Sequence, residues 1–371
     1  MASEPAQAAS WRSELIARLW LTAGVLLGYA PLLGFDKLII TDDGFVSDIW
    51  NGELPVRAYL GQVLREHGHL LTWYDGVCSG APSVGLEEPL SVSAYTALSP
   101  GAATCALFLT WVLIAAHGSY WLARRSGASR AGAVLSGLAF AMSGYLVTQL
   151  KHMSLVGTCV WLPTGLALLD TGLGPERTWA QRALRLSLFG CVFGEQVLCG
   201  FPQSIYICGL VYGAYALQRV LRNPPVPGET FQQRVLLPLM AAGLAVAVGA
   251  AAGAISLLPL AALGAVSDRS HGNTWEWATQ LNYDPKDLVM FVAPYANGDA
   301  SDGTFHSKAI FWEDYGYVGL ATFLLALYAI VRERRSPHVR FFALWAVIAL
   351  LFVLGPATPV FRIAFEVLPG F

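Results

Sequence analysis

The sequence predicts an all-α, polytopic integral membrane protein with about nine to ten transmembrane helices. Three observations support this fold class. First, 55% of the 371 residues are hydrophobic and 13% are charged, about half the charged share of a soluble domain, and the mean hydropathy is +0.51. Second, apolar runs of about 20 residues, long enough to cross a bilayer as a helix, recur along the chain. Third, positive charges alternate between loops as the positive-inside rule requires.

The apolar runs justify the predicted helices one by one. They lie at 16–35, 102–123, 131–149, 154–171, 185–201, 203–219, 236–264, 315–331 and 341–355, with 356–371 as a candidate start for one more. The first residues are polar and include acids, so the first run is predicted to remain as a helix and not to be a cleaved signal peptide. We expect one transmembrane domain over residues 1–371.

The distribution of charge predicts the orientation. With a cytoplasmic N-terminus, 15 of the 23 Lys and Arg residues fall on the cytoplasmic side and seven on the other side, as the positive-inside rule requires. Of the 25 acids, nine lie in residues 36–100 and eight in residues 265–314. Both segments are therefore predicted to be extracytoplasmic loops. No basic stripe is present, so we expect no nucleic-acid partner.

The loop 36–100 carries its own predicted helix. Apolar residues recur there at three- and four-residue intervals with polar residues between them, the pattern of a short amphipathic helix at a membrane surface; they are Leu54, Val56, Tyr59, Leu60, Val63 and Leu64. Aromatic residues and a Gly/Pro-rich stretch follow at 73–85, which predicts an ordered, interface-anchored loop.

Several functions are excluded by missing motifs. Five of the six cysteines lie inside apolar runs, where cysteine acts as a small apolar residue, and no CxxC spacing is present, so neither a disulfide framework nor a zinc site is expected. The sequence has no GxGxxG, P-loop, HExxH or GxSxG motif, so nucleotide-driven, metalloprotease and α/β-hydrolase chemistry have no support.

Five stretches carry a resemblance to a known family. They are 47–60 with 70–82, 136–169, 200–207, 312–327 and 354–371. In order and content they resemble the YfhO family of bacterial membrane proteins, and the architecture resembles the GT-C glycosyltransferases. Two departures are present: this chain has Phe201 where the family tends to have His within a Gly-His-Pro-Gln run, and it stops at Phe371 where members continue. The resemblance therefore implies an N-terminal portion of a longer protein.

The resemblance implies a transferase in the bacterial cytoplasmic (inner) membrane with an extracytoplasmic active site. It would move a sugar from a polyprenyl-phosphate carrier to an envelope glycopolymer, lipid or protein, with inversion. Such transfer needs one carboxylate base, because the phosphate leaves without an acid. Asp48 matches best, and Asp42 and Asp43 are the competitors. Each of the three has a second interpretation as a helix cap or a solvated loop acid.

Further side chains are candidates for substrate binding. Glu53, Arg57, Lys151, His152, Glu195, Gln203 and Glu313 are the predicted set. Arg57, Lys151 and His152 would meet the phosphate, although a lysine and a histidine at this depth also fit an interfacial role. Glu195 lies inside a span, where a carboxylate is costly. Glu53 and Glu313 could orient hydroxyls or help to hold a divalent cation, Mg or Mn, but no metal ligand set is predicted.

A transporter or lipid-linked sugar flippase is the alternative. The many spans, Glu195 and the small residues of 236–264 favour it, whereas the two large outer loops and the lack of a visible inverted repeat disfavour it. A non-catalytic assembly subunit is a third interpretation. Asp170, at a predicted cytoplasmic end, is expected to be structural.

Overall fold

The computed structural model describes residues 4–39, 47–76, 79–83, 87–175, 177–225, 227–267, 270, 272–307 and 310–368. The chain divides into two compact units. Unit 1 comprises Met1–Met142 and Leu150–Leu260, and unit 2 comprises Ser143–Gln149 and Ala261–Phe371. The described residues are mostly helical, which confirms the predicted all-α class.

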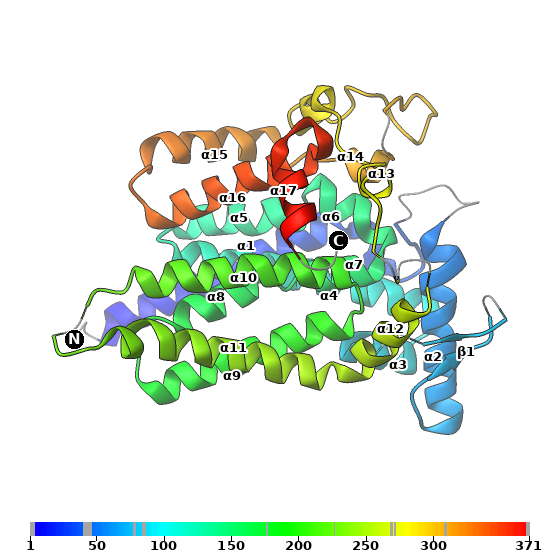
Figure 1. Ribbon diagram of the computed structural model, residues 1–371, viewed down its shortest axis with the longest axis horizontal. Helices are drawn as coiled ribbons and strands as arrows, with labels where there is room; N and C mark the ends of the chain where they lie inside the picture. The colour runs from blue at the N-terminus through cyan, green and yellow to red at the C-terminus, as the bar shows by residue number, and fades with distance from the viewer. Residues whose placement is uncertain are drawn as a thin grey trace. The chain divides into compact units, whose positions relative to one another are not determined.

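Unit 1 is a bundle of long helices. They are α1 (Glu4–Gly28), α4 (Pro100–Arg125), α5 (Arg130–Ala141), α7 (Met153–Cys159), α8 (Leu162–Gly172), α9 (Trp179–Leu198), α10 (Pro202–Leu221) and α11 (Leu237–Ala252), followed by α12 (Ala254–Ala265), which continues into unit 2. Figure 1 shows α8, α9, α10 and α11 running alongside one another, and α4 contacts α8. Short helical turns lie at Ala30–Gly34 and Gln232–Leu236. The predicted spans from 16–35 to 236–264 each correspond to one or two of these helices.

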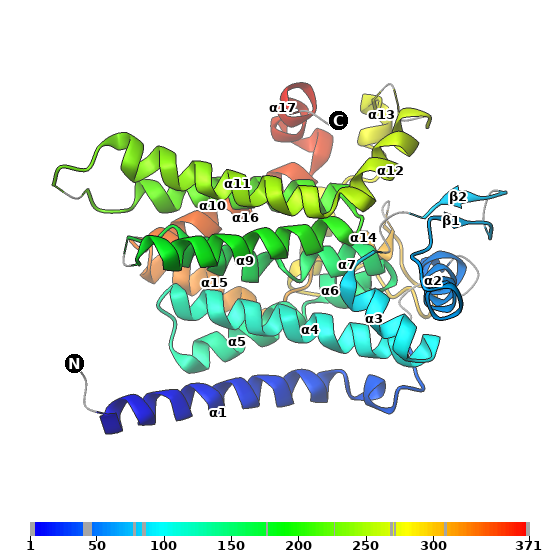
Figure 2. The same cartoon turned by 90° about the horizontal axis from the view of Figure 1, so that it is seen from below.

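The described parts of the loop 36–100 from residue 47 onward lie at one end of this bundle. A helical turn at Ile49–Glu53 leads into α2 (Leu54–His67). Two short antiparallel strands of two residues each, β1 (Trp73–Tyr74) and β2 (Ala81–Pro82), then form a hairpin. The next helix, α3 (Pro89–Ala97), leads into α4. Figure 2 shows α2 and the hairpin together at the end away from the start of α1. The predicted helix 54–64 is confirmed by α2, which buries Leu60 and Val63, whereas the hairpin was not predicted.

Three predicted spans are interrupted, each for a local reason. The run 131–149 breaks after α5, where the Ser143 hydroxyl accepts from the N–H of Leu146 and caps a new helix. The run 154–171 breaks where Pro163 enters the first turn of α8, because proline lacks the N–H that would continue the previous helix. The run 236–264 breaks at Gly253, between α11 and α12.

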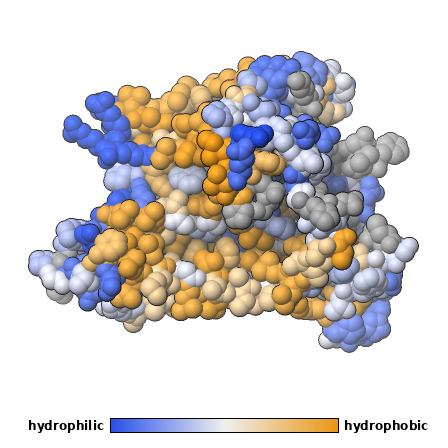
Figure 3. All heavy atoms as spheres, in the orientation of Figure 1, coloured by the Kyte–Doolittle hydropathy of each residue, from blue (hydrophilic) through white to orange (hydrophobic). Residues whose placement is uncertain are grey.

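Four helical segments among the described residues are long and apolar enough to cross a membrane. They are Pro100–Arg125, Arg130–Lys151, Met153–Gly172 and Gln232–Ala252. On the face shown in Figure 3, the surface over α10 and α11 is largely hydrophobic, and exposed residues there include Leu217, Leu237, Met240, Leu244 and Val248. Apolar side chains on the outside of a helical bundle are what lipid contact requires.

Small residues bring α9 and α11 into close contact, as the Gly/Ala-rich run predicts. A Cβ placed on Gly190 would lie 2.8 Å from the carbonyl oxygen of Ala245, and one on Gly194 would lie 3.1 Å from that of Gly249.

At the end opposite α2, Asp170 of α8 pairs with Arg125 at 2.8 Å and Arg219 at 3.0 Å. This buried acid therefore joins α4, α8 and α10.

Unit 2 contains α6 (Gly144–Thr148), a turn that begins at Gln149 (Gln149–Lys151), α13 (Trp275–Ala278), a 3₁₀ helix at Pro285–Phe291, α14 (Phe311–Asp314), α15 (Leu320–Arg332), α16 (Pro337–Val353), a turn at Gly355–Ala357 and α17 (Pro359–Val367). α15 and α16 form a helical pair (Figure 1). Trp275 of α13 packs on Phe361 and Phe365 of α17, with ring centroids 5.7 and 5.4 Å apart.

Candidate functional site

Asp48 stands at the entrance to the helical turn that precedes α2. Its backbone is already helical, and its side chain makes no capping hydrogen bond to that turn. Pro55 in the first turn of α2 fixes where the chain becomes a regular α-helix, since proline is tolerated there. The carboxylate is therefore available for contacts outside its own segment.

Those contacts come from the residues just before α7. Asp48 Oδ2 lies 2.9 Å from Lys151 Nζ and 2.9 Å from His152 Nε2. The lysine side chain is 2% exposed, the histidine 23% and the aspartate 52%. Burial acts to raise the pKa of Asp48, but the hydrogen bond and charge of Lys151, followed by those of His152, outweigh it and lower the pKa below its usual value. Asp48 is thus held as a carboxylate at neutral pH.

Glu53, one helical turn further on, is tied to a buried arginine. Arg57 NH2 lies 3.0 Å from Glu53 Oε2, and Arg57 also donates to Ser91 Oγ at 2.6 Å and to Ser154 Oγ at 3.0 Å. Arg57 is 1% exposed. Burial acts to lower its pKa, but Glu53 and then Glu88 outweigh this and raise it. Arg57 therefore joins α2, α3 and α7 as a permanently charged buried group.

The same network continues into the bundle. Ser91 donates to Glu88 Oε2 at 2.5 Å, and Trp111 of α4 donates to Glu88 Oε1 at 3.1 Å. The N–H of Ser154, in the first turn of α7, donates to Glu53 Oε1 at 3.3 Å. Every charge in this set meets a partner, which offsets the large cost of removing these groups from water, and the network fixes α2 on the end of the bundle.

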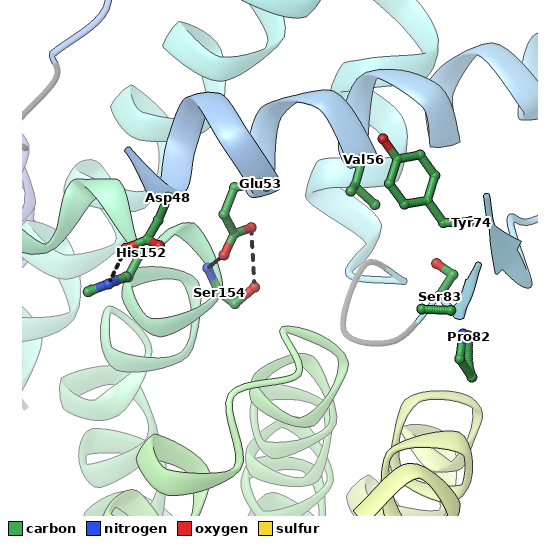
Figure 4. A pocket seen from close by; sticks show the side chains of 10 residues that line it. Asp48, Glu53, Val56, Tyr74, Pro82, Ser83, His152 and Ser154 are labelled. Carbon is green, nitrogen blue, oxygen red and sulfur yellow. Dashed lines mark hydrogen bonds and ion pairs between the residues drawn. The ribbon is translucent and has the colours of Figure 1, made fainter. Parts of the chain in front are cut away.

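A pocket of about 360 Å³ lies beside these groups (Figure 4). It is lined by Asp48, Gly52, Glu53, Val56, Tyr74, Ala81, Pro82, Ser83, His152 and Ser154. Its volume lies at the lower end of the range for small-molecule sites. Figure 4 shows Asp48, His152, Glu53 and Ser154 gathered on one side and Tyr74, Pro82 and Ser83 on the other.

Four of the predicted site residues come together here. Asp48, Glu53 and His152 line the pocket, and Lys151 contacts Asp48 without lining it. Arg57 lies outside the lining, with its guanidinium engaged by Glu53, Ser91 and Ser154. Asp42 and Asp43 lie outside the described residues.

The other predicted residues lie elsewhere. Glu195 is half-buried within α9, Gln203 is exposed in the first turn of α10, and Glu313 is exposed in α14 of unit 2. Sequence reasoning missed Ser83, Ser91 and Ser154, because a lone serine carries no pattern, and it treated Tyr74 only as part of an interface-anchored loop. The signal that could have found the hairpin is Gly76 and Gly80 between two short segments.

The described side chains of the pocket do not form a ligand set for a divalent cation. Among the described residues, no group of three or more His, Cys, Asp or Glu side chains is arranged to hold a metal ion. The two pocket carboxylates already face basic side chains, Asp48 with Lys151 and His152, and Glu53 with Arg57. A hard divalent ion takes several oxygen ligands, more than these two engaged carboxylates supply, so the reaction proposed for this pocket uses the described side chains alone.

The fold and its apolar helices define the class: a mostly helical, multi-pass integral membrane protein. No family model matches the sequence, so the resemblance to the YfhO family stays a prediction, and no curated protein matches it. Among solved structures, the chain is similar to the archaeal oligosaccharyltransferase AglB from Archaeoglobus fulgidus, in complex with an inhibitory peptide and a dolichol-phosphate, with 14% identity and a TM-score of 0.47. The alignment covers 95% of this chain and 48% of AglB, so this chain spans about half its length.

Proposed function

We propose that this protein is a membrane glycosyltransferase that moves a sugar from a polyprenyl-phosphate carrier to a cell-envelope acceptor on the extracytoplasmic side. The observation that carries the proposal is the Asp48 carboxylate, held at 2.9 Å from both Lys151 and His152 at the edge of a pocket. A carboxylate that accepts a proton, with a lysine and a histidine beside it, is the kind of arrangement that transfer from a sugar phosphate needs.

The chemistry follows from the charges. An acceptor hydroxyl attacks the anomeric carbon, the bond from this carbon to the phosphate oxygen breaks, and the electron pair leaves with the polyprenyl phosphate. The hydroxyl proton passes to Asp48, which is ionised at neutral pH because its pKa is lowered. The transition state resembles an oxocarbenium ion, and negative charge from Asp48 and Glu53 beside the ring stabilises it.

The two basic side chains, Lys151 and His152, have different places. His152 lines the pocket and can contact the leaving phosphate, whereas Lys151 is 2% exposed and lies behind Asp48. When protonated, His152 adds a charge-assisted hydrogen bond to the phosphate oxygen, the kind of contact that strengthens as charge develops. Lys151 keeps Asp48 ionised and oriented. The pocket is next to α2, the helix predicted to lie at the membrane surface, where a lipid-linked substrate is presented.

The test is sugar transfer by the full chain in lipid, from a radiolabelled polyprenyl-phosphate sugar, with Asp48→Asn compared against Asp75→Asn. Asp75 lies in the same loop, is exposed and does not line the pocket. We expect Asp48→Asn to lose at least about 100-fold in rate, the usual contribution of a positioned base. Its unfolding temperature should also fall, because the buried Lys151 loses its counter-charge, so the rate is compared at a temperature where both proteins are folded. Asp75→Asn should resemble wild type in both measurements. Transfer by Asp48→Asn at the wild-type rate would sink the assignment of the base. Absence of transfer by wild type from any donor would favour transport instead, with Glu195 as its first candidate residue.

A further inference from the structure

The pocket has two ends of different chemistry (Figure 4). Asp48, Glu53, His152 and Ser154 make one end polar and charged. The other end is apolar apart from the hydroxyls of Tyr74 and Ser83. It is lined by Val56 of α2 and by the hairpin residues Tyr74, Ala81, Pro82 and Ser83. The proposed reaction uses side chains of the charged end, and it assigns no substrate contact to the hairpin end.

The hairpin holds its aromatic rings in fixed places. Tyr74 pairs with Ala81 and Trp73 with Pro82, and Ser83 donates its N–H to the carbonyl of Thr72 at 3.1 Å. The Tyr74 ring lies 5.6 Å from that of Tyr59 on α2. Gly80 has φ of +108°, which favours glycine, and a Cβ there would lie 2.7 Å from Cζ2 of Trp73. Tyr74 therefore lines the pocket, while Trp73 is 52% exposed outside it, as successive strand residues should be.

Ser83 supplies an independent sign of a ligand. The residue is 6% exposed and lines the pocket. Its buried Oγ has no hydrogen-bond partner within the part of the chain that the structure describes. Leaving a buried hydroxyl unsatisfied is destabilising, and most buried polar atoms in folded proteins have a partner. A bound molecule with a hydroxyl at this position would supply it.

We propose that the hairpin end of the pocket binds a pyranose ring. Tyr74 and Pro82 would contact the apolar C–H face of the ring, and Ser83 Oγ would exchange a hydrogen bond with a ring hydroxyl. Serine can donate and accept, which suits a hydroxyl partner. A lipid chain would leave Ser83 unsatisfied, so it fits this end poorly. This inference rests on the proposed function, because the phosphate of a donor at His152 would direct its sugar along the pocket toward the hairpin.

The test compares two ligands that differ only in the sugar. Citronellyl phosphate carries the lipid and the phosphate, and citronellyl-phosphoryl-hexose adds the pyranose; binding of both to the full chain in nanodiscs is measured by titration calorimetry. We expect Tyr74→Ala to weaken binding of the sugar-bearing ligand about tenfold and Ser83→Ala about fivefold. Neither variant should change binding of citronellyl phosphate by more than about twofold. Tyr74→Phe, which keeps the ring, and Trp73→Ala, which alters the exposed neighbour, should bind both ligands as wild type does.

Thermal unfolding separates this role from a structural one. Because Ser83 Oγ has no partner among the described residues, Ser83→Ala should leave the unfolding temperature unchanged or raise it. Three results would overturn the inference. One is a lower unfolding temperature of Ser83→Ala with unchanged ligand binding. The others are an equal loss of affinity for both ligands in the variants, and a wild type that binds the sugar-bearing ligand no more tightly than citronellyl phosphate.

Two further arms complete the design. A methyl hexoside titrated alone shows whether the pyranose at the hairpin belongs to the donor or to the acceptor. If Tyr74→Ala and Ser83→Ala weaken binding of the methyl hexoside but not of citronellyl-phosphoryl-hexose, the pyranose belongs to a saccharide acceptor. Sugar-dependent binding that is lost in Tyr74→Ala, in a protein that transfers no sugar, would support this subsite and contradict only the proposed transfer.

Discussion

Lys151 and Asp48 meet at 2.9 Å, with the lysine side chain 2% exposed and the aspartate 52% exposed. The pair thus places a buried positive charge directly behind a carboxylate that faces the pocket. A lysine so deeply buried is stable as a cation only beside a counter-charge. Among the groups that lower the pKa of Asp48, Lys151 has the largest effect, and the pH dependence of transfer tests this relationship.

The first prediction concerns the pH dependence of transfer. Replacing Lys151 by Met removes the hydrogen bond and the charge that lower the pKa of Asp48, while burial, which raises it, remains. The acidic limb of the pH–rate profile should therefore move to higher pH, because the base becomes protonated earlier. His152→Gln should move it less, since the effect of His152 on this pKa is smaller. An acidic limb that stays in place in Lys151→Met would show that Asp48 is not the titrating base.

The second prediction concerns the buried arginine. Arg57→Met leaves Glu53 and Glu88 without the cation that they face, and breaking a buried ion pair from one side costs about 3 to 5 kcal/mol. We expect a large loss in the free energy of unfolding, measured by denaturant titration in detergent. Glu66→Gln, an exposed change on the same helix α2, should cost less than about 0.5 kcal/mol. A stable Arg57→Met protein that binds donor poorly would instead identify Arg57 as a ligand-binding residue.

The third prediction concerns a buried acid in unit 2. Asp314 is 1% exposed, and its Oδ2 is buried without a hydrogen-bond partner among the described residues. Burial, together with the nearby charge of Asp287, raises the pKa of Asp314 to about 6. The Asp314 carboxyl therefore binds a proton more tightly in the folded protein than in the unfolded chain. Its contribution to the free energy of unfolding is fully present below about pH 4 and is lost as the pH rises through about 6.

Asp314→Asn should therefore stabilise the protein at pH 7.5, by up to about 3 kcal/mol, and reduce the loss of stability between about pH 5 and 7.5. Thermal unfolding at the two pH values measures this. Glu276→Gln, an exposed acid of the same unit, is the control and should change neither value. If Asp314→Asn lowers the unfolding temperature at pH 7.5, the carboxylate is held as an anion by a favourable contact.

The fourth prediction concerns helix packing. A Cβ on Gly249 of α11 would collide with the backbone of Gly190 on α9, whereas one on Gly243, two turns earlier, would meet nothing within 4 Å. Gly249→Ala should lower the unfolding temperature, because backbone atoms cannot move aside. Gly243→Ala should be neutral or slightly stabilising, by up to about 1 kcal/mol. Equal effects of the two changes would mean that α9 and α11 do not pack at this distance.

Much of the fold was predictable because it depends on local hydropathy. Apolar runs of sufficient length predict helices, and each run corresponds to helices such as α4, α9 and α16. The three-to-four-residue period of 54–64 predicted α2, and Asp170 near the basic loops was expected to be structural, as its pairs with Arg125 and Arg219 confirm. The breaks at Ser143 and Gly253 were missed because a cap and a glycine interrupt a helix without changing its hydropathy.

The sequence by itself determined the class of protein, the apolar helices and the acidic loop, since burial in lipid and helical periodicity act over neighbouring residues. Only the tertiary structure decided which side chains share a site. Arg57 and Ser154 are 97 residues apart in the sequence yet hydrogen-bonded, and Asp48 meets Lys151 and His152 only because α2 docks on α3 and α7. The pocket also needed the hairpin, whose two-residue strands are too short to produce a pattern. Contacts between distant segments depend on packing and buried charge, which no local sequence pattern records.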